Sequence, residues 1–417
     1  MKKAHSPIDS LVTETVFGAD SPARENSRRR IRDTAHEQGI YVASIHGLYE
    51  AAGKSLFSGM TIPAINIRGI TYDVARAVFR AARKGEVGAF IFEIARSEIG
   101  YTGQRPAEYE TCVLAAAVKE GFQGPVFLQG DHFQVKADRY GSDPEKELEA
   151  IRELIRESVD AGFLNIDIDA STLVDLKKTA LEEQQELNCH VTAALTDYIR
   201  RIEPQGIPIA IGGEIGEVGG RNSTMEDLNA FMSGYLKRLG SNIKGISKIS
   251  VQTGTSHGGV VLPDGSIAKV QIDFHTLEQI SKVVRKEYGM GGAVQHGAST
   301  LPDEAFDKFP QVGTLEVHLA TGFQNMIYDS PYFPKELLKD IYSHILKKYA
   351  GERKPGETEE QFLYKTRKKA FGDFKREMWS LPEENLQGLR QVLEERFSLL
   401  FRKLNVVHSR ELVLKYA

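Results

Sequence analysis

Short apolar segments alternate with amphipathic stretches along most of this chain, from about residue 61 to residue 320. Eight of the segments are rich in Val, Ile and Phe, and most of them end in Gly, His, Asp or Ser. Each has the length of a strand, so the pattern predicts eight β-strands. They are residues 61–69, 88–95, 124–132, 164–171, 207–216, 248–254, 291–297 and 313–320.

The stretches between these segments have the pattern of helices. Residues 142–144 read Ser-Asp-Pro, a polar cap followed by Pro in the first turn. After this start, apolar residues return along one helix face, at positions 148, 151, 154, 155 and 159. Eight strands that alternate with helices predict an α/β protein with a (β/α)8 TIM barrel. An open doubly wound sheet is the alternative, but the turn after the first segment, IRGITYD, contains no GxGxxG.

Two flanking regions depart from this alternation. The first forty or so residues are polar, and the residues beyond about 330 are charged with helical periodicity. The sequence therefore predicts an N-terminal helical extension (1–60), a barrel catalytic domain (61–330) and a C-terminal helical extension (331–417). The C-terminal extension is expected to pack on the barrel or on a partner subunit.

The composition is that of an ordinary globular protein, with 41% hydrophobic and 26% charged residues. The formal net charge is -4 and both signs are mixed along the chain, which argues against nucleic acid as the main partner. No segment is long and apolar enough to span a bilayer, so no membrane partner is expected. The N-terminus, MKKAHSPIDS, lacks the apolar stretch of a secretory signal, and a cytoplasmic location is the expectation.

Histidines stand at the ends of three of the eight segments. Active sites of such barrels form at the carboxyl ends of the strands, and His132, His257 and His296 lie at three of these ends. Three imidazoles can hold a divalent metal ion and leave a position open for substrate, as catalytic Zn²⁺ requires. Zn²⁺ is the expected cofactor, and Co²⁺, Fe²⁺ and Mn²⁺ also accept imidazole. For each histidine alone, the alternative is a side chain bonded to the backbone.

Acidic residues accompany the histidines. Asp131 precedes His132 and suits general acid–base chemistry, with a helix cap as its alternative role. Asp169 and Glu214 are predicted as further metal ligands, where they bind a second or monovalent cation or orient the histidines. A cap or an ion pair is the structural alternative for both. Asp167 has the same strand parity as Asp169 but lies farther from the strand end, so Asp169 is preferred.

Glycine-rich turns follow several of the segments. Residues 212–220, 254–259 and 296–300 offer backbone N–H groups, together with Ser and Thr hydroxyls, that can bind a phosphate. In many barrels the phosphate site follows the seventh and eighth strands, which favours Gly297, Ala298 and Ser299. Plain tight turns are the alternative.

These motifs occur in the order of a known family. IPAIN (62–66), GDH (130–132), IDAS (168–171), GEIGEVGG (213–220), GTSHG (254–258) and HGAS (296–299) resemble the class II, metal-dependent fructose-bisphosphate and tagatose-bisphosphate aldolases. The resemblance covers roughly residues 61–320. It implies that the metal ion polarises the ketone of dihydroxyacetone phosphate and stabilises its enediolate. It also implies that Asp131 is the acid–base group at the aldol hydroxyl.

The resemblance further implies contacts and partners. A sugar phosphate is the implied substrate, and a homodimer or homotetramer is the implied assembly. Contacts to the substrate and its phosphate groups fall on Asn66, Gly220, Gly258, Gly297, Ala298, Ser299 and Thr321.

The sequence departs from the family at three places, one of which is Val261, where a phosphate-contacting Lys often stands. Ala320 and Gly322 stand where the family usually has an Asn-x-Asp pair after the eighth strand. His318, Gln324 and Asn325 are candidates to replace this pair. The acidic residue usual just after the loop glycines is also absent, so the base that forms the enediolate stays open. These departures indicate an atypical branch of the family.

The leading hypothesis is an aldolase that reversibly cleaves fructose 1,6-bisphosphate to dihydroxyacetone phosphate and glyceraldehyde 3-phosphate. Tagatose 1,6-bisphosphate or another ketose phosphate is the alternative substrate. Residues 88–132 also resemble the non-catalytic subunit of tagatose-bisphosphate aldolase, so a non-catalytic subunit of an aldolase complex is a third hypothesis. A barrel metal hydrolase is the fourth, and the sequence lacks the second cluster of His and Asp ligands that it needs.

The metal assignment predicts the behaviour of one variant. An aldolase exchanges the C3 proton of dihydroxyacetone phosphate with solvent, and a hydrolase does not. His257→Ala should abolish this exchange because the variant loses a metal ligand. Solvent deuterium incorporation followed by NMR measures it. A variant that exchanges as fast as the wild type would contradict the assignment of His257.

Overall fold

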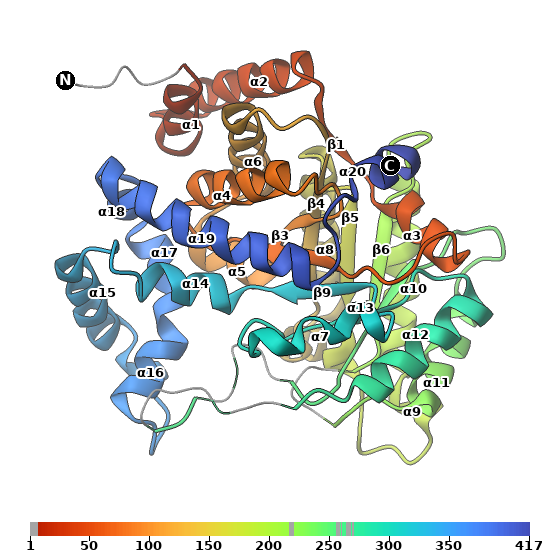
Figure 1. Cartoon of the computed structure of the whole chain (residues 1–417). Coiled ribbons are helices and arrows are strands. Elements are labelled where there is room, and N and C mark those ends of the chain that lie inside the picture. The colour runs from red at the N-terminus through yellow and green to blue at the C-terminus, as the bar shows by residue number, and fades with distance from the viewer. Residues whose placement is uncertain (1–6, 217–220, 256–258, 260, 264–267, 269–270) are drawn as a thin grey trace.

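Eight parallel strands form a closed barrel in the computed structural model of the chain, and helices surround the strands (Figure 1). The structure describes residues 7–216, 221–255, 259, 261–263, 268 and 271–417. Each predicted segment coincides with one strand, with the third strand running two residues past its segment, and the (β/α)8 barrel is confirmed. Neighbouring strands pair in sequence order, and the last pairs with the first to close the barrel. The strands are β2 (Ile62–Asn66), β3 (Ile91–Ala95), β4 (Gly124–Gln134), β5 (Asn165–Asp169), β6 (Ala210–Glu214), β7 (Lys248–Val251), β8 (Ala293–Gln295) and β9 (Glu316–Leu319).

Helices follow the strands and cover the outside of the barrel. The longer ones are α4 (Thr71–Lys84), α6 (Pro106–Glu120), α8 (Pro144–Asp160), α10 (Glu186–Ile202), α11 (Met225–Arg238), α12 (Phe274–Tyr288) and α14 (Thr321–Tyr328). Shorter ones are α5 (Arg96–Thr102), α7 (Ala137–Ser142), α9 (Leu181–Gln184), α13 (Lys308–Gln311) and the 3-10 turns Ser171–Leu173 and Asp303–Ala305. Helix α8 begins as predicted, with the Asp143 carboxylate accepting from the backbone N–H of Lys146. Among the described residues, no helix has the length and apolar character needed to cross a membrane.

The N-terminal region adds one strand that the sequence analysis did not predict. Helices α1 (Pro7–Phe17), α2 (Ser21–Glu37) and α3 (His46–Gly53) are joined by β1 (Ile40–Ala43), which pairs in parallel with β4. Phe127 of β4 pairs with β1 on one edge and with β3 on the other, so β1 lies on the β5 side of β4. With only four residues after a charged helix, β1 has too short a pattern to reveal its period.

The C-terminal region packs against the barrel of its own chain. It contains α15 (Lys335–Lys348), α16 (Glu359–Thr366), α17 (Ala370–Asp373), α18 (Lys375–Trp379), α19 (Glu383–Lys403), α20 (Arg410–Tyr416) and the 3-10 turns Ala350–Glu352 and Arg367–Lys369. Helix α19 runs beside α4 (Figure 1), and the buried Arg390 pairs there with Asp73. The Ser409 hydroxyl accepts from the backbone N–H groups of Gly88 and Ala89, just before β3. The predicted boundaries at residues 60 and 330 stay predictions.

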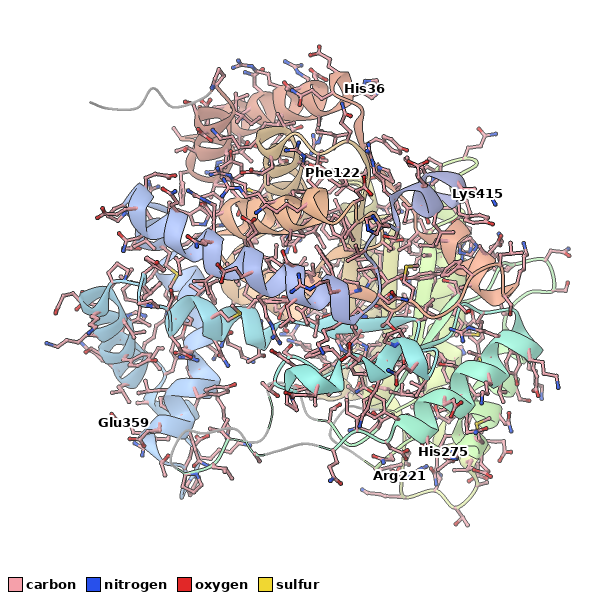
Figure 2. All side chains as sticks on the ribbon, in the orientation of Figure 1. His36, Phe122, Arg221, His275, Glu359 and Lys415 are labelled. Atoms are coloured by element: carbon pink, nitrogen blue, oxygen red, sulfur yellow. The ribbon has the colours of Figure 1, made fainter. Side chains whose placement is uncertain are left out.

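Aromatic side chains join the barrel, α4 and α19. The ring centroid of Phe79 lies 5.1 Å from that of Phe92 and 4.8 Å from that of Phe122. Phe122, labelled in Figure 2, follows α6. The ring of Phe401 on α19 lies 5.7 Å from that of Phe90. All five rings are buried, so this cluster fastens the C-terminal extension to the amino end of the barrel.

The interior of the barrel carries charged side chains in place of a purely aliphatic core. Lys248 is fully buried, and its Nζ lies 2.9 Å from Asp167 Oδ1 and 2.5 Å from Glu316 Oε1. Gly212 makes room for this cluster, since a Cβ there would lie 2.3 Å from Asp167 Oδ1. Side chains alternate along a strand, so Glu316 and His318 face the same side of β9.

Removal of the interior lysine should destabilise the whole barrel. Lys248→Met leaves two buried carboxylates without their cation, which we expect to cost about 3–5 kcal/mol of unfolding free energy. Urea denaturation followed by circular dichroism measures the loss. Lys282→Met is the matched control because its exposed pair with Glu278 lies on the outside of α12, and its midpoint should not move. Equal midpoints for the two variants would contradict the role of Lys248.

Candidate active site

A cavity of about 230 Å³ opens at the carboxyl ends of the barrel strands. Eight residues that the sequence analysis named as candidates line it: Asn66, Asp131, His132, His296, Gly297, Ser299, His318 and Thr321. Ala298 is fully buried between two of these residues. Gly220, His257 and Gly258 lie outside the described residues. The structure therefore brings together residues from β2, β4, β8 and β9 that are far apart in the sequence.

His132 reaches the cavity because β4 is irregular at its carboxyl end. The pairing of β4 with β5 shifts between Gly130 and Phe133, and His132 has a φ of 39°. A Cβ at Gly130 would lie 2.4 Å from the Phe133 ring, so this bulge requires glycine there. In a regular strand Asp131 and His132 would face opposite sides, whereas here both line the cavity.

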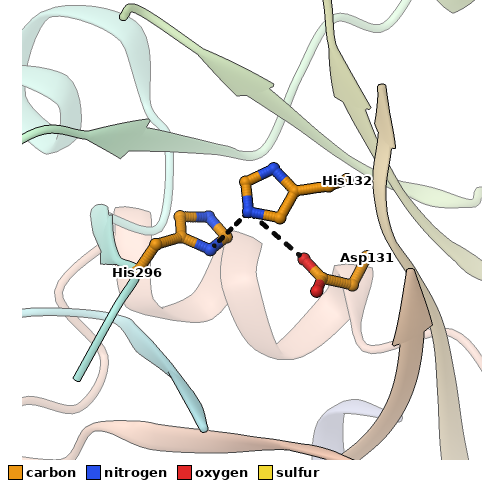
Figure 3. Close-up of side chains that lie close together, drawn as sticks. All are labelled: Asp131, His132 and His296. Atoms are coloured by element: carbon orange, nitrogen blue, oxygen red, sulfur yellow. Dashed lines mark hydrogen bonds and ion pairs between the residues drawn. The ribbon is translucent and has the colours of Figure 1, made fainter. Parts of the chain in front are cut away.

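Two imidazole nitrogens face each other across the cavity. His132 Nε2 lies 2.9 Å from His296 Nδ1 (Figure 3). His132 Nδ1 faces two carboxylates and must donate, so the neutral ring presents a lone pair at Nε2. Ser250 Oγ lies 2.9 Å from His296 Nε2 and can accept its N–H, which presents the lone pair of Nδ1.

This donor pair suits a metal ion. Two facing lone pairs repel unless a proton or a metal ion lies between them, and a metal ion can take the place of the proton that joins the two rings. Nitrogens in one tetrahedral zinc shell lie roughly 3.3 Å apart, given Zn–N distances of about 2.0–2.1 Å, which is close to the observed 2.9 Å. Asp131 Oδ1 is also near, 3.7 Å from His132 Nε2 (Figure 3). The residues present therefore fit a divalent ion held by His132 and His296.

Asp169 and Glu214 lie on the other side of the His132 ring. Asp169 Oδ2 is 3.0 Å and Glu214 Oε2 is 3.1 Å from His132 Nδ1. Asp169 is held in turn by Ser171, whose hydroxyl donates to Oδ1 at 2.6 Å. Carboxylates at this position orient a metal-binding histidine and strengthen its basicity. The same three side chains also converge closely enough to hold a second cation.

The two carboxyl groups beside His132 differ in how readily they take up a proton. Burial alone lowers the pKa of His132, but Asp131 and Glu214 outweigh it and the pKa is raised. Burial, with the charge of Asp169, raises the pKa of Glu214 to about 7. The hydrogen bonds from His132 and Ser171 outweigh burial at Asp169 and lower its pKa. Asp169 is therefore the permanent anion of the pair, and Glu214 is the carboxyl that can take up a proton.

Asp131 is held from two sides. The Asn66 amide lies 3.5 Å from Oδ2, and His318 Nδ1 lies 3.1 Å from Oδ1. The His318 ring centroid is 4.0 Å from that of His296, so it forms a third imidazole in the cavity wall. His318, one of the candidates to replace the Asn-x-Asp pair, thus lies beside the predicted acid–base residue. Among the three candidates to replace the usual Asn-x-Asp pair, it is the one that lines the cavity.

Residues that the sequence analysis missed complete the cavity. Glu93 forms part of its floor, and Arg68 and Lys368 add positive charge on the side of β2. Arg68 donates to the Thr321 hydroxyl at 3.2 Å and to Glu98 at 2.7 Å. Lys368 comes from the C-terminal extension, and no sequence motif links it to the barrel. A charged residue inside an apolar strand segment was the one available signal for Glu93.

The chain that forms this cavity matches a known protein family. The model of the family described as fructose-bisphosphate aldolase class-II matches residues 47–380. The chain belongs to the class II fructose-bisphosphate aldolase family. This family is metal-dependent, in agreement with the facing histidine nitrogens and the other groups of possible ligands.

Relatives of this class II family member are distant. The D-tagatose-1,6-bisphosphate aldolase subunit GatZ of Escherichia coli strain K12 is 27% identical over 136 residues, 31% of this chain and 31% of GatZ. GatZ of Escherichia coli strain HS matches equally. The chain thus aligns with about a third of the length of the curated relatives that it matches.

Solved structures share the fold of this class II family member. The fructose-bisphosphate aldolase (Fba) of Campylobacter jejuni superposes with a TM-score of 0.52 at 19% identity, covering 89% of this chain and 96% of that one. Fructuronate-tagaturonate epimerase UxaE of Cohnella laeviribosi gives 0.62 at 11% identity, covering 92% and 86%. At these identities the likeness concerns the fold alone.

The role of Ser250 can be tested through metal affinity. Ser250→Ala removes the group that orients His296, and loss of such a partner typically weakens metal binding roughly 10–100-fold. Competition with a chromophoric chelator measures the affinity of the purified protein for Zn²⁺. Ser247→Ala is the control, because its hydroxyl bonds to the Ile211 carbonyl instead. If both variants bind Zn²⁺ as the wild type does, His296 is not oriented as we describe.

Proposed function

We propose that this class II family member is an aldolase that reversibly cleaves fructose 1,6-bisphosphate to dihydroxyacetone phosphate and glyceraldehyde 3-phosphate. One observation carries the proposal: His132 Nε2 and His296 Nδ1 face each other at 2.9 Å, with Asp131 beside them in one cavity. A protein that only binds ligands has no need of an acid–base group directly beside a metal-binding nitrogen pair.

His132 and His296 would hold the ion, together with the predicted ligand His257. A divalent ion bound there would polarise the ketone of the substrate and favour negative charge on its oxygen. Zn²⁺ is the proposed cofactor, on the basis of the imidazole donors. Asp169 and Glu214 either keep the His132 ring in orientation or bind the proposed second or monovalent cation.

Asp131 is the proposed base for the hydroxyl at C4 of the ketose. Its carboxyl group is buried at the cavity and held by Asn66 and His318, so it meets the substrate in one orientation. In the cleavage direction Asp131 takes the hydroxyl proton while the bond between C3 and C4 breaks, and in the synthetic direction it returns that proton.

The phosphate groups of the substrate have positive and polar partners in the cavity. Gly297, Ser299 and Thr321 line it near β8 and β9, and Ser299 Oγ accepts from the backbone N–H of Ala320 at 2.6 Å. Arg68 and Lys368 add cationic groups. A bisphosphorylated sugar therefore suits the cavity better than a neutral one.

Tagatose 1,6-bisphosphate is the second candidate substrate. The name of the matching GatZ proteins supports it, and the two ketoses differ only in configuration at C4, the carbon whose hydroxyl Asp131 would meet. A homodimer or homotetramer in the cytoplasm stays part of the proposal. A non-catalytic subunit would bind no metal and show no activity alone.

The proposal is tested by cleavage of the two ketose bisphosphates. We expect the purified protein to cleave fructose 1,6-bisphosphate faster than its tagatose epimer and to lose activity with EDTA. Asp131→Asn should lower cleavage by roughly 10²–10⁴-fold because a general base is lost, with metal content unchanged. A coupled assay for glyceraldehyde 3-phosphate and metal analysis measure both. Metal-loaded protein that cleaves neither epimer would exclude the proposed activity.

A further inference from the structure

Glu93 is a buried carboxyl group to which neither the family motifs nor the proposed cleavage step assigns a role. It stands on β3 with no exposed surface and lines the floor of the cavity. Its Oε2 accepts from the Gln129 amide at 3.0 Å and lies 3.1 Å from His318 Nδ1. Among the described residues, its Oε1 has no hydrogen-bond partner. A buried carboxyl oxygen without a partner is costly, so its retention on a cavity floor indicates a ligand.

His318 connects Glu93 to Asp131. One nitrogen, Nδ1, lies 3.1 Å from Glu93 Oε2 and 3.1 Å from Asp131 Oδ1. The other, Nε2, lies 2.6 Å from Glu316 Oε1. Because carboxylate oxygens only accept, both ring nitrogens must donate, and His318 is an imidazolium with no lone pair for a metal ion.

The two carboxyl groups compete for the single N–H at Nδ1. Like charges this close cannot both remain ionised at low cost, which separates such a pair into an acid and a base. Burial, together with the charge of Asp131, raises the pKa of Glu93 to about 7. Since Oε2 already accepts from Gln129 and faces His318, the proton of Glu93 belongs on Oε1.

We propose that Glu93 is a second acid–base residue of the aldol reaction, which exchanges a proton with C3 of the substrate while Asp131 serves the C4 hydroxyl. This inference rests on the aldolase function proposed above. It deepens that function by naming a group for the enolising step, which the sequence motifs left open.

The proton balance closes within this group. In cleavage, Asp131 takes the C4 hydroxyl proton, the aldehyde leaves, and the electrons of the bond between C3 and C4 remain as the enediolate. Glu93 then gives its proton to C3 and becomes a carboxylate, which completes dihydroxyacetone phosphate. His318 passes its Nδ1 proton to Oε2 of Glu93 and takes the proton of Asp131 in return. The Glu93 carboxyl group then turns over, which brings the proton back to the cavity side and restores the starting state. No external oxidant or reductant is needed.

The experiment separates the two carboxyl groups by separating the two half-reactions. Exchange of the C3 proton of dihydroxyacetone phosphate with D2O needs the group at C3 and does not need the group at the C4 hydroxyl. We expect Glu93→Gln to slow exchange by roughly 10²–10⁴-fold, the typical worth of a general acid or base. Asp131→Asn should slow cleavage more than it slows exchange, and Glu93→Gln should not show this difference. NMR follows exchange, and metal content is measured on the same samples.

A matched pair of shorter variants guards against a folding defect. Glu93→Asp keeps an acid and Glu93→Asn removes it at equal size, so Glu93→Asp should exchange at least about tenfold faster. Equal exchange by this pair, or exchange by Glu93→Gln at the wild-type rate, would overturn the role of Glu93 and leave the aldolase proposal intact. If the metal-loaded wild type itself does not exchange, the aldolase proposal fails first.

Discussion

Charge balance inside the barrel is the constraint on which the site depends. Four carboxyl groups meet two cations along the barrel axis: Glu93, Asp131, Asp167 and Glu316 with Lys248 and His318. Removing such charges from water costs several kcal/mol per ion unless each keeps its partner. The partners therefore hold one another in place, and the floor of the cavity is set by this network.

The network also decides which side chains of the site stay cations and which can bind a metal ion. Burial alone lowers the pKa of Lys248, but the charges of Asp167 and Glu316 outweigh burial and raise it. Lys248 therefore stays a cation and is not a nucleophilic amine. His318 likewise stays a cation because it has four carboxyl neighbours. His132 and His296 present lone pairs when their rings are neutral, because their other nitrogens already have acceptors. A histidine side chain thus serves as a metal ligand or as a cation, depending on the partners of its two ring nitrogens.

Backbone strain at the end of β4 brings the metal-binding and acid–base groups into one place. His132 has a positive φ, which costs a non-glycine residue on the order of 1–3 kcal/mol and persists only where surrounding contacts determine it. Here Asp169 and Glu214 on one side and His296 on the other hold the ring. The C-terminal extension adds Lys368 to the same cavity, so a region outside the barrel contributes to the site.

The sequence by itself determined the barrel, because eight strand-length apolar segments between amphipathic stretches have few other ways to bury their surface. It also selected Asp131, His132 and His296, since residues at strand ends must meet at one face of a barrel. Tertiary structure alone decided the rest. The parity rule cannot foresee a bulge that turns Asp131 and His132 to one side, and β1 is too short to show a period. Neighbours that are distant in the chain determine the roles of Glu93, His318 and Lys368, because hydrogen bonding and burial depend on position in space.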